Sequence, residues 1–283
     1  MPNDVLANIK QHFNKTGSLL EQKIHIALDR HPKFVSKREH PYSSMNIINE
    51  TIPQILEGTI DVFAVAKVSD DTSLCLCIEC KKANPKQKHW VFELRTTGDE
   101  IYRFVYYDAK LKALNYEKNI FFPSLGYKGM EYFDKAIQVY QFKDLSGELS
   151  RDAQEMAYHS LKQANQAIKA FAPAEQEIFR LLRTHVTSIL YLPVVVTTAN
   201  LWTTEYKPED VSWETGEVEN DKLDLKGKNW VHYEFPLPVN LKLKGREDLE
   251  FEKRPTFVVK ADKFPNFINN LLKDLPSYIL DWK

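Results

Sequence analysis

The chain has 283 residues, of which 43% are hydrophobic and 27% are charged. This composition is typical of a globular protein and excludes a disordered or collagen-like one. The 38 Lys and Arg residues are balanced by 39 Asp and Glu residues, which gives a formal net charge of -1 and excludes nucleic-acid binding driven by overall basic charge. We expect one domain over residues 1–283, with a core at about 18–200, an aromatic-rich insertion at 84–145 and a C-terminal α/β extension at 201–283.

No segment of the sequence predicts secretion or membrane insertion. Residues 1–15 lack the basic and then apolar order of a signal peptide. The most apolar stretch, 189–202, contains Pro193 and is too short to span a bilayer. All three cysteines lie within 75–80, a spacing that favours buried thiols in a reducing compartment over disulfides. We therefore predict a cytoplasmic protein without a membrane partner.

A helix is expected near the N-terminal boundary of the core. Gly17 is placed to end a preceding helix, and Ser18 is placed to begin the next one. Ser18 and Glu21 have the spacing of a capping box, in which the two side chains satisfy backbone N–H groups of the first turn. Pro32 is expected to end this helix.

The following segment predicts strands. A short strand is expected at 34–38, and the polar segment 41–54 is expected to be irregular. The runs 58–66 and 74–81 are apolar on both faces, which is typical of central strands of a sheet. The polar residues 69–71 between them predict a turn, so the two runs are expected to form an antiparallel hairpin.

The second half of the chain predicts more helices and strands. Strands and loops are expected over the aromatic-rich 84–130, and helices from Ser150 onward, interrupted at Pro173 and reaching Ile189. The run 192–199 has the composition of a buried strand. A polar stretch is expected at 204–228, strands are expected at 230–235 and 256–259, and a last short helix is expected at 267–275. The whole predicts an α/β fold with a central mixed sheet flanked by helices.

Three polar residues interrupt the two central strands. Asp61 lies within an apolar strand, where a carboxylate is costly to bury unless it is paired or bound to metal. Glu79 and Lys81 lie at the end of the next strand, and residues two apart on a strand project from the same face. Pairing of the two strands would place Asp61 beside them.

Two carboxylates and an amine in this position predict a hydrolytic site. Magnesium prefers oxygen ligands, so Asp61 and Glu79 are expected to hold it, and the cation would activate water and neutralise phosphate charge. Lys81 would orient or deprotonate the attacking water, or stabilise the transition state. The alternative is a semi-buried ion-pair network without catalysis.

The segments 60–62 (Ile-Asp-Val) and 78–82 (Ile-Glu-Cys-Lys-Lys) resemble the motif of the PD-(D/E)XK, or restriction-endonuclease-like, superfamily. The resemblance covers about 18–200 and includes an upstream helix bearing Glu21, followed by a strand, and a helix and an apolar strand after the motif. One departure is that Ile60 stands where many members have proline. The resemblance implies a restriction-endonuclease-like core with an insertion and an extension.

The resemblance further implies a divalent-metal-dependent nuclease that uses Mg²⁺, with Mn²⁺ as an alternative. Asp61, Glu79 and the Cys80 backbone carbonyl would be metal ligands, and Lys81 would be the catalytic lysine. Glu21 matches a helix glutamate that completes the metal site in some members, and its alternative role is the capping box.

Nucleic acid is the expected partner, with DNA favoured over RNA. Lys82, Lys86 and Lys88 are candidate nucleic-acid contacts, and the alternative is a solvated loop. Cutting both strands of a duplex would need two sites, so a homodimer or a partner subunit is an open alternative. The leading functional hypothesis is a DNA endonuclease of restriction, defence or repair type. The alternatives are a catalytically silent or partner-activated nucleic-acid-binding module, and an RNA nuclease.

Overall fold

The protein was analysed as a computed structural model. The residues that it describes are 17–49, 52–69, 72–84, 88–95, 104–108, 113–117, 125, 135–142, 153–171, 188–218, 223–238 and 251–279. The helix expected before Gly17, the lysine Lys86 and most of the helix expected between Pro173 and Ile189 lie outside these ranges. Among the helices of the described ranges, none has the length and apolar character needed to cross a bilayer.

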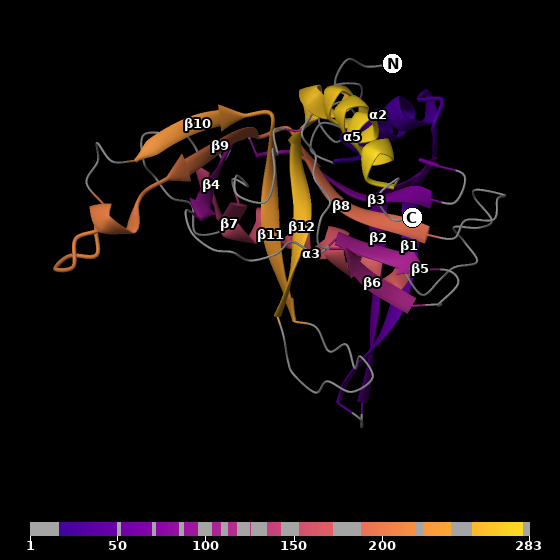
Figure 1. The fold of residues 1–283 in the computed structure, drawn as a ribbon, viewed down its shortest axis with the longest axis horizontal. Helices are drawn as coiled ribbons and strands as arrows, with labels where there is room; N and C mark the ends of the chain where they lie inside the picture. Colours follow the sequence, from indigo (N-terminus) through magenta and orange to yellow (C-terminus); the bar gives the residue numbers. More distant parts are fainter. Residues whose placement is uncertain are drawn as a thin grey trace, which may run out of the picture.

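The described strands form a mixed 12-stranded sheet, with the path β1-β2-β3-β8-β12-β11-β7-β4-β9-β10 and the hairpin β5–β6 attached to β8 (Figure 1). The strands in chain order are β1 (Phe34–Asn49), β2 (Ile52–Lys67), β3 (Thr72–Lys81), β4 (His89–Arg95), β5 (Phe104–Asp108), β6 (Ala113–Glu117), β7 (Lys135–Phe142), β8 (Ser188–Thr197), β9 (Asn200–Glu205), β10 (Asp224–Lys228), β11 (Trp230–Pro238) and β12 (Phe251–Lys260). The expected α/β class and mixed sheet are therefore confirmed.

The first three strands and β8 form the part of the sheet that carries the predicted site. β1 and β2 pair antiparallel, as do β2 and β3, which confirms the predicted hairpin. β3 and β8 then pair in parallel from Thr72 opposite Ser188 to Lys81 opposite Thr197. A parallel pair requires a crossover connection, and the helix α3 (Ala153–Phe171) lies in the chain between these two strands.

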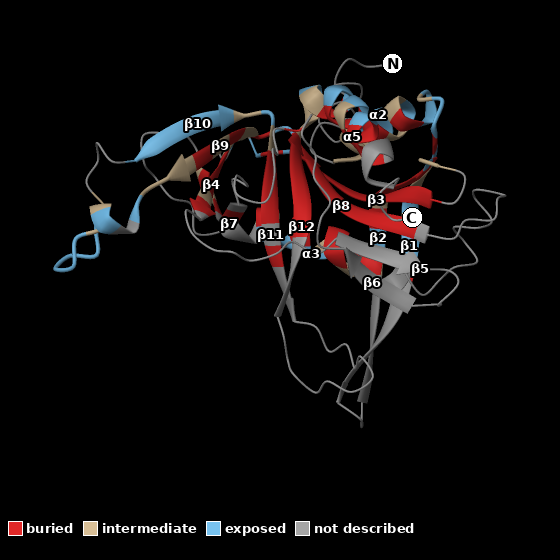
Figure 2. Ribbon diagram, in the orientation of Figure 1, coloured by how far each residue is buried: buried red, intermediate tan, exposed pale blue. Residues whose placement is uncertain are grey.

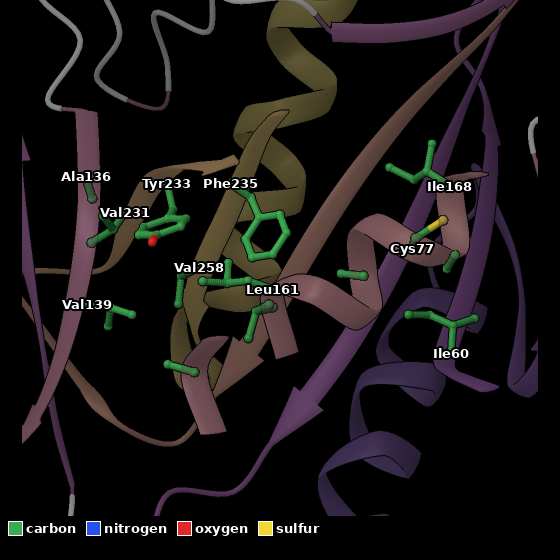
Figure 3. Close-up of a cluster of buried hydrophobic side chains, with 14 of the residues drawn as sticks. Ile60, Cys77, Ala136, Val139, Leu161, Ile168, Val231, Tyr233, Phe235 and Val258 are labelled. Atoms are coloured by element: carbon green, nitrogen blue, oxygen red, sulfur yellow. The ribbon is translucent and has the colours of Figure 1, made fainter. Parts of the chain in front are cut away.

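Helices cover both faces of this part of the sheet. α2 (Ser18–Asp29) and α5 (Phe264–Ile279) pack on one face through Ile24, Leu28 and the apolar side of α5, in what we call the α2-side cluster. α3 packs on the opposite face in the α3-side cluster, where Ile168 lies near Cys77 and Leu161 lies near Val258 (Figure 3). The apolar residues of α3 recur at helical spacing, which is why one stripe of this helix is buried. The central strands are buried along most of their length (Figure 2).

Two sequence-based boundaries were wrong. The segment 41–54 was expected to be irregular, but β1 continues to Asn49 and pairs with β2 as far as Ile52. Its polar residues do not alternate with apolar ones, so the sequence lacks the period that marks a strand, whereas pairing with a neighbour satisfies the backbone. Ile189, expected at the end of a helix, lies in β8.

The aromatic-rich segment expected as an insertion also contributes to the main sheet. β7 pairs with both β11 and β4, and β4 also pairs with β9. The C-terminal strands β11 and β12 lie between β7 and β8 in the sheet path. The segments expected as an insertion and as a C-terminal extension therefore share one continuous sheet with the rest of the predicted core.

Gly58 on β2 allows a close approach by an aromatic ring. Tyr42 of β1 pairs with Gly58, and a Cβ atom at position 58 would lie 2.5 Å from both Cζ and Oη of Tyr42. The Tyr42 ring is 7% exposed in the α3-side cluster, so it has little room to move aside.

We expect Gly58→Ala to lower the free energy of unfolding by about 1–3 kcal/mol through overpacking. Chemical denaturation would measure the loss, and the double variant with Tyr42→Ala should recover part of it because the two sites are coupled. Gly227→Ala is the matched control, since its Cβ would make an ordinary 3.6 Å contact with Trp202. An equal loss of unfolding free energy in Gly58→Ala and Gly227→Ala would contradict the close contact between position 58 and Tyr42.

Candidate active site

The site lies where β2 and β3 diverge. Their backbone pairing ends with Val62 opposite Ile78. Beyond that point the Cys80 backbone N–H donates to Asp61 Oδ2 at 2.7 Å, so a side chain takes the place of the next ladder bond. Asp61 is therefore fixed between the two strands, as the sequence pattern predicted.

The alternation of side chains breaks at Asp61. Ile60 packs in the α3-side cluster together with Phe63, whereas Val62 packs in the α2-side cluster. Regular alternation would place residues 60 and 62 on one face. The break leaves Asp61 at the position where the strand changes face, half-buried at the gap between β2 and β3.

Glu79 and Lys81 form an ion pair beside Asp61. Lys81 Nζ donates to Glu79 Oε1 at 2.8 Å, and the side chains of Lys81 and Glu79 are 26% and 1% exposed, respectively. The second oxygen of the carboxylate, Glu79 Oε2, is buried without a hydrogen-bond partner. A buried carboxylate oxygen left unsatisfied is costly, which indicates that a proton or a cation belongs at this point.

The electrostatics of the site are those of two adjacent carboxyl groups. Burial, and then the nearby Asp61 carboxylate, raise the pKa of Glu79 to about 7, against the opposing effect of Lys81. Burial also raises the pKa of Asp61, although the Cys80 N–H and Lys81 favour its ionised form and Glu79 donates a hydrogen bond to it when protonated. Near neutral pH the pair is therefore poised to share one proton, as two close carboxylates commonly do.

Lys81 keeps its proton in this environment. Burial alone would lower the pKa of its amine, but the Glu79 and Asp61 carboxylates outweigh that effect and raise the pKa. Of the roles considered for Lys81, this arrangement favours an ammonium that stabilises negative charge over a base that removes a proton from water.

Glu21 reaches the same site from α2, but the capping box predicted for it is not formed. The N-cap residue of α2 is Gly17, and no side-chain hydrogen bond caps the helix. Glu21 Oε2 instead accepts a long 3.5 Å hydrogen bond from Arg38 of β1. Burial and the Asp61 carboxylate raise the pKa of Glu21, and Arg38 opposes them.

Gly17 leaves a small space between two of the predicted ligand oxygens. A Cβ atom at position 17 would lie 3.3 Å from Glu21 Oε1 and 3.7 Å from the Cys80 carbonyl oxygen. Glu21 Oε1 and the Cys80 carbonyl oxygen, which the sequence resemblance gives as possible metal ligands, therefore both lie close to this Cβ position.

Glu39 of β1 faces Asp61 in a strained backbone conformation. Arg38 pairs with Val62 and His40 with Ile60, so the intervening residues Glu39 and Asp61 lie outside the pairing. Glu39 has a φ of 48°, the only positive value among the described non-glycine residues. Its negative charge contributes to the raised pKa of Asp61. Strained backbone of this kind is found preferentially at functional sites.

We expect the backbone at position 39 to favour glycine over a β-branched residue. Glu39→Gly should unfold within about 1 kcal/mol of the wild type, whereas Glu39→Val should lose about 1–3 kcal/mol because valine rarely adopts this φ. The Glu39 side chain is 69% exposed, so neither change removes buried contacts. Thermal or urea unfolding would compare them, and equal stability of the two variants would show that the backbone there is relaxed.

The structure describes two of the three lysines that were predicted to contact nucleic acid. Lys82 directly follows the site on the chain and is exposed, and Lys88 is exposed just before β4. Lys86 lies outside the described residues. The three cysteines are buried and free, as predicted. Sequence reasoning gave no role to Arg38, the last residue of the predicted strand 34–38, or to Glu39, which follows it, and the only signal for them was their charge beside an apolar strand.

The residues present fit a magnesium site of low protein coordination. Within the described ranges, no group of three or more His, Cys, Asp and Glu side chains has the geometry of a metal centre. Magnesium keeps several waters and needs only one or two carboxylates. Asp61 and Glu79 would supply these, and Glu79 Oε2, which has no hydrogen-bond partner, would be available as a ligand.

Comparisons of the chain with models of known protein families, with curated protein sequences and with solved structures found no match. The resemblance to the PD-(D/E)XK superfamily therefore rests on the sequence motif and on the order of the elements in the sequence.

Proposed function

We propose that the protein is a divalent-metal-dependent phosphodiesterase of the PD-(D/E)XK type, acting on nucleic acid as an endonuclease. The observation that carries the proposal is the half-buried Asp61 carboxyl beside the buried Glu79 carboxyl, with Lys81 bonded to Glu79, at the gap between two central strands. Glu79 Oε2 is buried and has no hydrogen-bond partner, so it would be satisfied either by a proton shared with Asp61 or by a bound cation.

The order of the elements around the site also supports the proposal. The chain order α2, β1, β2, β3 and, after the intervening strands β4–β7, α3 and β8, with β3 and β8 parallel and with α2 and α3 on opposite faces, is the order that the sequence resemblance leads us to expect. Fold analogy alone does not establish an activity, so the argument rests on the site.

Each residue has a role that follows from its position. Asp61 and Glu79 would hold the cation, together with the Cys80 carbonyl and, from α2, Glu21. When bound, the divalent cation neutralises negative charge on the phosphodiester. The Lys81 ammonium lies on the exposed side of the pair, where it would donate to a phosphate oxygen as charge develops in the transition state.

A substrate panel tests the proposal. Supercoiled plasmid, linear duplex, single-stranded DNA and RNA would each be incubated with the protein in Mg²⁺, Mn²⁺ or EDTA, with Asp61→Ala as the control. The proposal predicts cleavage of at least one substrate in the metals, none in EDTA and none by the variant. Cleavage of DNA would support the favoured substrate class, and cleavage of RNA alone would support the RNA nuclease. Absence of cleavage of all four substrates would favour a catalytically silent or partner-activated binding module.

A further inference from the structure

The connection between β9 and β10, which we call the arm, exposes one tryptophan to solvent. β9 and β10 pair antiparallel at the edge of the sheet opposite to β1, and the chain between them extends away from the sheet (Figure 1). Trp213, in this connection, is 101% exposed, the highest value among the exposed large apolar residues of the described ranges. The surrounding turn is exposed as well (Figure 2).

The turn that carries Trp213 is ordered by its own hydrogen bonds. Val211 and Val218 form a β-bridge at its base, the Ser212 N–H donates to the Glu217 carbonyl at 2.9 Å, and the Gly216 N–H donates to the Ser212 carbonyl at 2.9 Å. Gly216 has a φ of 71°, a conformation that glycine adopts without strain. The backbone that carries Trp213 is therefore held in a defined turn, which lowers the backbone entropy lost on binding.

The charges around Trp213 select the class of partner. Residues 208–221 contain six acidic residues and neither Lys nor Arg. Within the described part of this segment the carboxylates are those of Glu209, Asp210, Glu214 and Glu217. Aromatic residues that stack on nucleic-acid bases usually lie beside cations that attract the phosphates, and this segment has no such cations. Its negative charge would repel nucleic acid, and it would repel an anionic membrane surface in the same way.

We propose that the Trp213 turn, residues 211–218, docks into a second, different protein whose surface has an apolar socket rimmed by Arg or Lys. Tryptophan is among the residues that contribute most to the affinity of protein interfaces. The carboxylates would pair with arginines at the rim, where bidentate contacts give specificity. The arm and the strands of the candidate site lie at opposite ends of the sheet path, so the Trp213 turn is distant from the gap between β2 and β3 along the sheet.

A display library of protein fragments from the genome of the source organism tests the proposal with the full-length chain as bait. We expect binders whose affinity falls about 30-fold or more with Trp213→Ala, the size of an interface hot spot. Affinity should also fall with the double reversal Glu214→Lys and Glu217→Lys, and with rising salt. Val35→Ala, which trims another exposed apolar side chain on β1, is the matched control and should bind within twofold of the wild type.

Trp213→Ala should unfold at the same temperature as the wild type, so a loss of binding would not reflect misfolding. Recovery of no binder that depends on Trp213 would overturn the proposal, as would a binder that proves to be a fragment of this same chain. It would also be overturned if Trp213→Ala weakened binding of a labelled oligonucleotide, since that would assign the tryptophan to nucleic acid. None of these results depends on whether the predicted active site cleaves its substrate.

Discussion

Replacing Lys81 by alanine should reduce metal-dependent cleavage by about 10²–10³-fold or more, the usual effect of removing one charge-stabilising donor from an active site. The ammonium is bonded to Glu79 at 2.8 Å and is partly exposed beside Asp61, so its loss removes the positive charge nearest to the substrate side of the pair. Single-turnover cleavage of the substrate identified by the panel would measure the change.

The same variant should keep its fold and its affinity for nucleic acid. Filter binding in Ca²⁺ or EDTA would test affinity, and thermal unfolding would test the fold. Lys82→Ala is the matched control, because Lys82 is the next residue and is exposed; we expect it to weaken binding slightly and to leave the cleavage step intact. Full activity of Lys81→Ala, or equal losses in the two variants, would contradict the role given to Lys81.

Replacing Glu79 by glutamine should stabilise the metal-free protein at alkaline pH and abolish cleavage. Glu79 has an ordinary pKa of 4.5, which the fold raises to about 7. Between these values the folded state binds more protons than the unfolded state, so its contribution to the free energy of unfolding falls as pH rises from about 4.5 to about 7 and stays low above that. The full shift corresponds to about 3 kcal/mol.

Glutamine does not titrate, so it escapes this loss while losing part of the pairing with Lys81. We therefore expect Glu79→Gln to gain on the order of 1–3 kcal/mol relative to the wild type at pH 8, and little or nothing at pH 4.5. Urea unfolding in EDTA across this range would measure the difference. Glu214→Gln, which changes an exposed carboxylate on the Trp213 turn, is the control and should follow the wild type. A Glu79→Gln variant that loses stability at pH 8 would contradict the account.

The residues of the candidate site were predictable from the sequence because each breaks a strong local pattern. Asp61 interrupts an apolar strand, and Glu79 and Lys81 share one face at the end of the next, so pairing of the strands was enough to bring them together. The break in alternation at Asp61 was not predictable in the same way, because it lies opposite the left-handed backbone of Glu39 on a neighbouring strand, and neither irregularity has a sequence signal.

Other features were not predictable because they depend on contacts between residues that are distant in the sequence. Glu21 has the spacing of a capping box with Ser18, but Gly17 begins the helix and Arg38, on a different strand, supplies the partner of the glutamate. The extent of β1 was missed because pairing with β2, rather than the polarity of its own residues, defines it. The exposure of Trp213 was equally hidden, since the composition of its segment predicted only a polar excursion.

The central claim is that Asp61 and Glu79 hold a divalent cation where, in its absence, they share a proton. Calorimetric titration of Mg²⁺ into the wild type, Asp61→Asn and Glu79→Gln, in two buffers of different ionisation enthalpy, tests it most directly. The account predicts one magnesium bound by the wild type with release of protons at pH 6.5 that declines above pH 7, and no binding by either variant. Magnesium binding that is absent from the wild type, or that survives unchanged in both variants, would contradict it.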